Sequence, residues 1–320
     1  MKWGIMGTGR IAKLFCETLE KMEDTQIYAI GSRTIAKAES FANEFHVEKS
    51  YGSYEELVCD KDIDVIYVAT PIAYHYEHVK LCLNANKNVL CEKAFTMHEK
   101  EAKELHSIAK QKNLFLMEAL WTKCHPVYQK IMQWKKEGLL GEIQAVEAKF
   151  YTLGGTEHRL YKDKKQGGAL YDVGIYPLMY ACALLGYDPK RISAHAVIAG
   201  DKVDVMDSIQ LEYATGAFAN LTAGLSCKRQ TSLYIYGSKG RVLIDEEHFY
   251  KAQHAVLYGM NNEVLDCIDA PFEISGYEYE ALEVKECIEQ GKISSKLIPM
   301  EETIAIIGLL EKIKNILTNN

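Results

Sequence analysis

A glycine-rich turn near the start of the chain has the residue types needed to bind a dinucleotide. Gly7, Gly9 and Ala12 form the pattern G-x-G-x-x-A directly after Lys2–Met6, an apolar segment that predicts a buried strand. The first glycine allows a tight turn, the second lets a pyrophosphate approach the backbone, and the small third residue lets the next helix pack closely. Free N–H groups at that helix start favour phosphate. The pattern predicts a dinucleotide site, and the alternative is a tight strand–helix turn in another α/β protein.

The residues after the second expected strand, 26–31, indicate which dinucleotide is bound. At this position, about twenty residues after the glycines, NAD enzymes place an acidic residue on the ribose 2′-hydroxyl. The chain has Ser32 and Arg33 there, with Lys37 one helical turn later. A guanidinium can pair with a 2′-phosphate, and no carboxylate repels it. We therefore expect NADP to be preferred, with NAD possible. The alternative is that Arg33 is solvated and stacks on the adenine.

Polar or turn residues also follow the other strands expected in the first part of the chain. Apolar segments predict these strands at 64–69, 88–91 and 114–117. The residues that follow them are Thr70-Pro71, Glu92-Lys93 and Glu118. Helices are expected between the strands, two of them opened by capping-box patterns at 53–56 and 96–99. The alternation predicts a doubly wound parallel sheet over residues 1–120, with its ligands at the C-terminal strand ends.

From residue 121 the pattern changes to several strands in succession. They are expected at 143–151, 192–199, 205–214, 217–226, 231–237 and 241–245. An apolar helical region, 167–185, is expected to cover one face of their sheet. Residues 121–298 are therefore predicted to form an α+β domain with an open, mainly antiparallel sheet. In the last segment, 299–320, an amphipathic helix is expected to pack back on the first domain. The fold class is thus α/β, a Rossmann domain followed by this second domain.

The other face of the second sheet is expected to be uncovered. Alternating apolar positions such as Ile209, Leu211 and Tyr213, or their neighbours, would lie on it. We therefore expect a homodimer or a higher homo-oligomer that forms through this face.

Composition limits the function further. The length of 320 residues predicts two domains. The net charge of −7 argues against a nucleic-acid partner. No apolar run is long enough to cross a membrane, and the first strand begins too early for a secretory signal. The nine cysteines show neither C-x-x-C nor zinc spacing. We expect reduced thiols, no metal and a cytoplasmic location.

Four motifs, in order, resemble those of the Gfo/Idh/MocA oxidoreductases over essentially the whole chain. They are G-T-G-R-I-A at 7–12, A-T-P-x-x-x-H at 69–75, C-E-K at 91–93 and G-G-A-L-Y-D-V-G-I-Y at 167–176. The D-V-G-I-Y form, with E-A-L-W-T at 118–122, is most similar to the dihydrodiol dehydrogenase and glucose–fructose oxidoreductase branch. The resemblance implies a Rossmann domain, an open C-terminal sheet often used for oligomerisation, an NAD(P) cofactor and a sugar, polyol or cyclic diol substrate.

The resemblance also implies catalytic residues. The lysine of the family's E-K motif is catalytic, here Lys93, and its partners are Asp172 and Tyr176, where many relatives carry His in place of the tyrosine. Hydride transfer needs a proton to leave or reach the substrate oxygen. An ammonium lowers the pKa of a nearby phenol, so Lys93 would let Tyr176 exchange that proton while Asp172 holds Lys93 or a substrate hydroxyl. By residue type alone, Lys93 could instead pair with Glu92, Tyr176 could pack in a core and Asp172 could cap a helix.

Further site residues are expected in both domains. The cofactor-binding set is Gly7, Thr8, Gly9, Arg10, Ile11, Ser32, Arg33, Lys37, Thr70, Pro71, His75, Glu92 and Lys93. His75 either caps its helix or approaches the cofactor. Trp121, Lys123 and Arg159 are candidate substrate residues; Trp121 could equally be ordinary packing, and Arg159 a solvated loop residue.

One position departs from the family motif. Ala94 stands where the usual E-K-P motif has a proline that is often cis. A peptide bond before alanine strongly prefers trans, so either the turn differs locally or the chain tolerates an unusual bond. Two other functions stay open: a nucleotide-binding sensor, which would be expected to have lost one of the three catalytic residues, and an enzyme whose tightly held cofactor cycles within each turnover.

Overall fold

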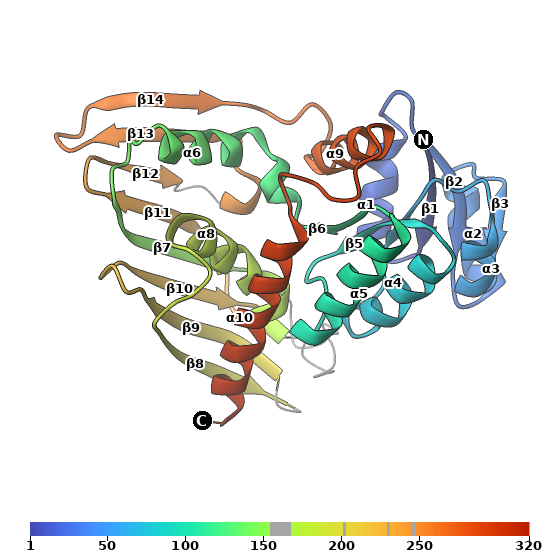
Figure 1. Cartoon of the computed structure of the whole chain (residues 1–320), viewed down its shortest axis with the longest axis horizontal. Helices are drawn as coiled ribbons and strands as arrows, with labels where there is room; N and C mark the ends of the chain where they lie inside the picture. The colour runs from blue at the N-terminus through green and yellow to red at the C-terminus, as the bar shows by residue number, and fades with distance from the viewer. Residues whose placement is uncertain (154–167, 201–202, 229–230, 245–247, 320) are drawn as a thin grey trace. The chain divides into compact units, whose positions relative to one another are not determined.

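The computed structural model describes residues 1–153, 168–200, 203–228, 231–244 and 248–319 (Figure 1). The chain forms two compact units, one made of Met1–Cys124 with Glu273–Ile304 and the other of His125–Phe272 with Ala305–Asn320. This division differs from the limits expected from the sequence, which were 1–120, 121–298 and 299–320. The segment Glu273–Ile304 belongs to the first unit, and the greater part of the last helix belongs to the second.

Six parallel strands form the sheet of the first unit. They are β1 (Lys2–Met6), β2 (Gln26–Gly31), β3 (Lys49–Tyr51), β4 (Val65–Val68), β5 (Asn88–Glu92) and β6 (Leu116–Ala119). Their order, β3-β2-β1-β4-β5-β6, is that of a Rossmann fold, and the prediction of a doubly wound parallel sheet is confirmed. Strand β4, in the middle of the sheet, and strand β6, at its edge, are both buried along their whole length. Helices cover both faces of such a sheet, which explains the continuous apolar run of β4.

Helices cover the first sheet on both sides. They are α1 (Arg10–Leu19), α2 (Ile35–Glu44), α3 (Tyr54–Cys59), α4 (His75–Asn84), α5 (Glu99–Lys112) and α9 (Tyr277–Glu289), with the short 3₁₀ segments η1 (Ile72–Tyr74) and η2 (Trp121–Cys124). Phe15 of α1, Phe41 of α2 and Val284 of α9 share one core with Tyr67. Helices α3, α4 and α5 pack side by side. Because α9 contributes buried residues to this core, the segment after the second sheet belongs to the Rossmann unit.

One of the two expected helix starts is confirmed and the other is wrong. Ser53 accepts a hydrogen bond from the Glu56 N–H at 3.2 Å and begins α3 as predicted. Helix α5 was expected to begin with Thr96 as its cap. The cap is instead His98, two residues later, in a reciprocal capping box with Glu101. The Thr96 hydroxyl donates a hydrogen bond to the carbonyl oxygen of His98 and so stabilises the N-cap residue.

Eight strands form the sheet of the second unit. They are β7 (Ile143–Tyr151), β8 (Arg191–Ala199), β9 (Val203–Glu212), β10 (Phe218–Gly224), β11 (Ser232–Gly237), β12 (Gly240–Ile244), β13 (His254–Gly259) and β14 (Val264–Asp269). The order is β14-β13-β12-β11-β7-β10-β9-β8, and only the β7–β10 pair is parallel. The mainly antiparallel sheet is confirmed. Strands β13 and β14, which the sequence reading missed, extend one edge.

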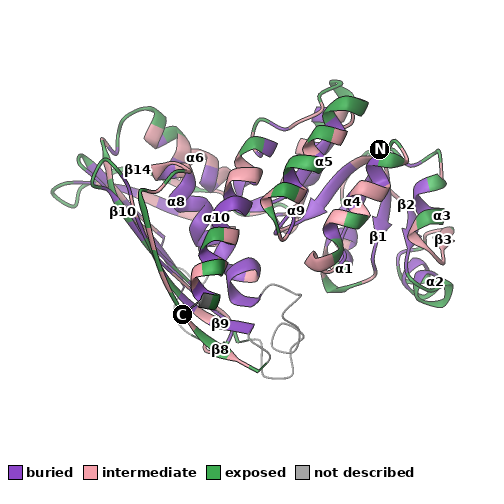
Figure 2. Ribbon diagram, turned by 60° about the horizontal axis from the view of Figure 1, so that its bottom comes forward, coloured by how far each residue is buried: buried purple, intermediate pink, exposed green. Residues whose placement is uncertain are grey.

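Helices lie on one face of the second sheet (Figure 2). They are α6 (Pro126–Lys136), the π-helical turn η4 (Leu170–Gly174) with α8 (Ile175–Leu185), and the greater part of α10 (Met300–Asn319). Ile209, Leu211 and Tyr213 are buried, so their assignment to the uncovered face was wrong. Their neighbours Ser208 and Gln210 are exposed instead. Within the described ranges, no helix is both long and apolar enough to cross a bilayer.

Candidate active site

The glycine turn has the geometry that a pyrophosphate requires. Gly7 has φ +110°, and a Cβ there would lie 2.9 Å from the Ala69 carbonyl oxygen, so only glycine fits. Gly9 is the N-cap of α1, and a Cβ built on it would meet no atom within 4 Å. Ala12 is fully buried against the sheet. The exposed helix start and the open space beside Gly9 fit a dinucleotide phosphate.

The end of β2 carries cations and no carboxylate. Ser32 is buried; its N–H donates to the Tyr51 carbonyl, and its hydroxyl lies 3.5 Å from that of Thr8 in the glycine turn. Arg33 and Lys37 are exposed, and neither forms an ion pair with another described residue. This arrangement leaves their charge available to an anion.

Two aromatic side chains near Arg33, Tyr54 and His78, were not among the residues expected from the sequence. Tyr54 and His78 pack edge to face at 4.7 Å, and both sense the Arg33 charge. His78 also meets the Thr70 hydroxyl at 2.8 Å. Burial, with the charges of His75 and Arg33, lowers the pKa of His78 to about 4, so this ring is neutral at physiological pH.

His75 lies beneath the turns that follow β4 and β5. Its Nε2 is 2.7 Å from the Thr70 carbonyl oxygen and its Nδ1 is 3.0 Å from the Ala94 carbonyl oxygen, and the ring is 1% exposed. Both neighbours are acceptors, so a neutral ring can donate to only one of them. Burial nevertheless lowers the pKa of His75. The ring therefore joins the Thr70 turn to the turn that carries Lys93.

Glu118 holds the turn after Lys93 from the other side. It is fully buried at the end of β6 and accepts hydrogen bonds from the Phe95 N–H and the Thr303 hydroxyl, each at 2.9 Å. Burial raises the pKa of Glu118 to about 7. The Lys93–Ala94 peptide bond, which lies in the turn that His75 and Glu118 contact, is cis. The chain therefore tolerates the unusual bond, the second of the two alternatives that the sequence left open. Lys93 itself is partly exposed.

Two further buried acids belong to this unit: Glu92, which precedes Lys93 in the chain, and Glu280 of α9. Glu92 accepts a hydrogen bond from the Tyr67 hydroxyl and is 6% exposed. Glu280 is fully buried, and neither of its oxygens has a hydrogen-bond partner among the described residues. Burial, reinforced by the Glu92 charge, raises the pKa of Glu280 well above its usual value. Burial at this position therefore favours the protonated form of Glu280.

The three candidate substrate residues have different surroundings. Trp121 is 6% exposed and stacks on Tyr277, with ring centroids 4.2 Å apart. Lys123 is buried and forms an ion pair with Glu302. Arg159 lies outside the described residues.

In the second unit, Asp172 and Tyr176 stand four residues apart at the junction of η4 and α8. Asp172 is partly exposed and Tyr176 is 6% exposed. The Tyr176 ring contacts Phe150 and Tyr250 at centroid distances of 5.6 and 5.1 Å. A π-helical turn inside a helix often marks a functional site, because it re-aims the side chains it carries.

The sequence reading also missed residues that support this helix. Asp204 and Asp207 are buried carboxylates on β9, and Asp204 contacts the start of the helix. The signal for Asp207 was available in the alternation of β9, which places this acid on the same face as Ile209 and Leu211, whereas the burial of Asp204 depends on an irregularity in the β8–β9 pairing.

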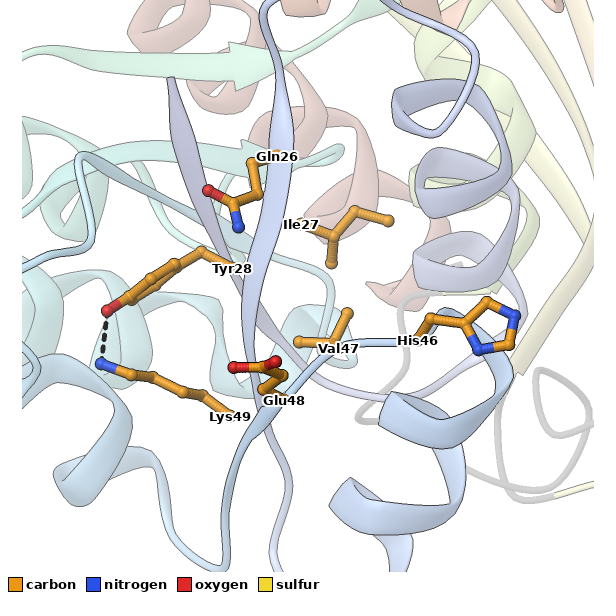
Figure 3. Close-up of a pocket in the computed structure, with 7 residues that line it drawn as sticks. All are labelled: Gln26, Ile27, Tyr28, His46, Val47, Glu48 and Lys49. Carbon is orange, nitrogen blue, oxygen red and sulfur yellow. Dashed lines mark hydrogen bonds between the residues drawn. The ribbon is translucent and has the colours of Figure 1, made fainter.

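A surface hollow in the first unit lies at the opposite ends of the strands. It is lined by Gln26, Ile27, Tyr28, His46, Val47, Glu48 and Lys49, where β2 and β3 begin (Figure 3). Lys49 donates to the Tyr28 hydroxyl within it. Because the glycine turn and the polar strand ends lie at the C-terminal edge, this hollow is not part of the candidate site.

Comparison with known proteins agrees with the geometry. Residues 1–120 match the model of the oxidoreductase family with an NAD-binding Rossmann fold, and residues 128–243 match the GFO/IDH/MocA C-terminal domain. The chain is 33% identical to trans-1,2-dihydrobenzene-1,2-diol dehydrogenase of Xenopus laevis, over 97% of this chain and 96% of that protein. The bovine (Bos taurus) enzyme of the same name is 32% identical, over 98% and 96%.

A solved structure supports the fold. KijD10, a 3-ketoreductase from Actinomadura kijaniata determined with NADP and TDP-benzene, has a TM-score of 0.86 at 24% identity, covering 98% of this chain and 97% of that one. The glycine turn, the sheet order and the full-length similarity all indicate a dinucleotide-binding oxidoreductase of one family. The chain therefore belongs to the Gfo/Idh/MocA family and is an NAD(P)-dependent oxidoreductase of the class that acts on CH–OH groups.

Proposed function

We propose that this protein transfers a hydride between NADP and a cyclic diol, sugar or polyol. The observation that carries the proposal is the full-length similarity to trans-1,2-dihydrobenzene-1,2-diol dehydrogenases, together with the presence of Lys93, Asp172 and Tyr176. A sensor that had lost catalysis would be expected to lack at least one of these three. A cyclic trans-diol is the first substrate class to test, and a hexose derivative is the second.

The end of β2 supports NADP as the cofactor. Arg33 and Lys37 are exposed, and Ser32 lies between them and the glycine turn through its contact with Thr8. Arginine can bind a phosphate through two parallel hydrogen bonds. NAD, which lacks this phosphate, would leave both cations without a partner.

The remaining expected cofactor residues have supporting roles in this proposal. Thr8, Arg10 and Ile11 would border the phosphates at the start of α1, and Pro71 would border the cofactor after β4. His75 would act by fixing the carbonyls of Thr70 and Ala94. Glu92 and Lys93 would stand at the nicotinamide end.

Three side chains would handle the proton. When bound, the nicotinamide supplies or accepts the hydride. Tyr176 would give a proton to, or take it from, the substrate oxygen, and the Lys93 ammonium would favour the phenolate form during that exchange. Asp172 would accept a hydrogen bond from Lys93 or from a second substrate hydroxyl. Trp121 and Arg159 remain the proposed substrate contacts outside this triad, whereas Lys123 is held in its ion pair with Glu302.

We also propose a homodimer in the cytoplasm. The face of the second sheet that none of the described helices covers is the surface proposed for the dimer. Six of the nine cysteines are buried, and no disulfide is present in the described ranges. Buried thiols support a reducing location.

The test is nicotinamide absorbance with purified protein, NADP+ or NAD+, and a panel of cyclic trans-diols, aldoses and polyols. Turnover with NADP+ and one substrate group is expected. Turnover only with NAD+ would overturn the cofactor assignment. Binding of NADPH without turnover of any substrate would favour the sensor, and NADP(H) that stays bound through gel filtration would favour the cycling cofactor.

A further inference from the structure

A buried carboxylate contacts the start of the helix that carries Asp172 and Tyr176. Asp204 of β9 is fully buried, and its Oδ2 accepts a hydrogen bond from the Leu170 N–H at 2.8 Å. The first N–H groups of a helix have no partner within the helix, and an acidic oxygen there is favoured by the helix dipole. Asp204 thus acts as an N-terminal cap supplied by a distant strand.

Glycine at position 168 is what lets this carboxylate approach. Gly168 has φ +71°, and a Cβ there would lie 2.3 Å from Asp204 Oδ1. Any other residue would collide with the carboxylate and strain the backbone. A second close approach fixes the same helix further along, where a Cβ on Gly174 would lie 3.3 Å from the Ala223 Cβ of β10.

A bulge brings a second acid beside the first. The β8–β9 register shifts between Val197 and Ile198, which pair with Met206 and Asp204. An extra residue in one strand breaks the alternation of faces, so Asp204 can share the inner face with Asp207. Asp207 is 1% exposed, and its cross-strand neighbours, Ala196 and Ala223, offer no side-chain donor.

The cluster balances its charge with one cation and one proton. Lys314 of α10 forms an ion pair with Asp204. Among the described residues, no group donates a hydrogen bond to either oxygen of Asp207. Burial, with the charge of Asp204, raises the pKa of Asp207 to about 9. Asp207 therefore carries a proton and can donate it to Asp204, which leaves the buried group neutral overall.

We propose that Asp204 is a positioning residue for Asp172 and Tyr176, held in place by Lys314 and Asp207. The inference rests on the proposed function, since it assigns Asp204 a role in the same reaction. In the proposed reaction, Asp204 does not touch the reacting atoms. It fixes the first turn of the helix, and with it the direction of the two side chains that follow within six residues.

Two substitutions at one position separate hydrogen bonding from charge. Asp204→Ala removes the acceptor for Leu170. Asp204→Asn keeps one oxygen for that N–H, while Asp207 can ionise and pair with Lys314. The matched control is Asp266→Asn, because Asp266 also pairs with a helix lysine, Lys130, in the same unit but does not contact η4.

Steady-state kinetics give the first readout. Asp204→Ala is expected to lower kcat by about tenfold or more with the KM for NADP(H) within about twofold, because small misplacement of reacting groups costs rate rather than cofactor affinity. Asp204→Asn is expected to recover most of the kcat. Gly168→Ala, which displaces the carboxylate from the other side, should resemble Asp204→Ala. Equal kcat for the alanine variant and the wild type would overturn the proposal.

Hydrogen exchange gives a readout that does not depend on turnover. Peptides covering Leu170–Tyr176 are expected to exchange faster in Asp204→Ala than in the wild type, with Asp204→Asn and Asp266→Asn close to the wild type. Unchanged exchange in Asp204→Ala would show that Asp204 does not hold the start of the helix, whatever the activity of the variant. A wild type that turns over no substrate would instead count against the proposed function, while the exchange data would still decide whether Asp204 holds the helix.

Discussion

At the scale of single residues, the candidate site depends on which charges remain available. Arg33 and Lys37 are exposed cations without a described ion pair, whereas Lys123 is buried against Glu302. Residue type alone does not separate these lysines and arginines. Their surroundings do, because a cation already paired in a buried site is costly to withdraw.

Arg33 is expected to select the cofactor. Arg33→Ala should raise the KM for NADP(H) far more than that for NAD(H), because only NADP has the 2′-phosphate that the guanidinium would bind. Initial rates with both cofactors measure this. Lys61→Ala, which removes an exposed cation elsewhere in the same unit, is the control. Similar changes for NADP(H) and NAD(H) in Arg33→Ala would contradict the assignment.

Tyr176 is expected to exchange the proton. Tyr176→Phe should lower turnover by about 10² or more, the usual scale for a general acid–base group, and leave NADPH binding unchanged. The matched control is Tyr180→Phe, one helical turn later, where the ring packs on Tyr128 and Phe249. Near-normal turnover in Tyr176→Phe would move the proton role to Lys93.

At the scale of elements, the site turns are held by buried polar groups on neighbouring strands and helices. His75 at the start of α4 and Glu118 at the end of β6 meet the turn after β5 at Ala94 and Phe95. In the second unit, Asp204 of β9 plays a comparable part for η4. Each contact replaces a backbone hydrogen bond that a tight turn or helix start cannot make by itself.

Glu118 should make stability depend on pH. Its pKa is about 7 in the folded protein and near 4.5 when unfolded, so the folded state holds the proton more tightly. The stability this group contributes is complete below about pH 4.5 and is lost as pH rises through 7, by roughly 3 kcal/mol at most. Glu118→Gln, which cannot ionise, should flatten this decline.

Urea unfolding of both proteins at several pH values measures the effect of Glu118. The difference in unfolding free energy, variant minus wild type, should grow between pH 5 and pH 8. Glu101→Gln in α5 serves as the control, since it removes a carboxylate that caps an exposed helix start. A difference that is constant with pH would show that Glu118 is ionised in the folded state throughout.

At the scale of the whole molecule, the second sheet presents a broad face that none of the described helices covers (Figure 2). Cross-strand rows place aromatic and aliphatic side chains side by side on it. One row joins Val256, Leu243 and Tyr234, and the next joins Tyr258, Arg241, Tyr236, Ala145 and Phe218. Tyr234 and Tyr236 stack at 6.3 Å, and Phe218 is 36% exposed. Arg241 lies within the second of these rows, and Glu147 continues the first. The partly exposed aromatic and aliphatic side chains on this face favour self-association.

A charge on this face should break the proposed dimer. Phe218→Asp is expected to shift the protein from dimer to monomer, because two copies would bury the new carboxylates against each other. Sedimentation velocity at micromolar concentration measures the change. Met260→Asp, at the exposed turn between β13 and β14, should leave the dimer intact. A wild-type protein that sediments as a monomer would rule this interface out.

Much of the fold followed from local sequence. The G-x-G-x-x-A turn, the alternation of strands and helices, and the capping box at Ser53 are short-range patterns, so they fixed the Rossmann sheet and its cofactor edge. Arg33 after β2 and the D-V-G-I-Y helix were readable for the same reason. The family resemblance supplied the roles that we propose for Lys93, Asp172 and Tyr176.

Tertiary structure decided what depends on partners distant in sequence. The membership of α9 in the first unit, the burial of Ile209 and Leu211, and the pairing of Lys123 with Glu302 all arise from packing between segments far apart. The same holds for Asp204, which caps a helix 34 residues away. A sequence pattern shows the spacing of a side chain within its own element, but its charge state and its role depend on which elements fold against it.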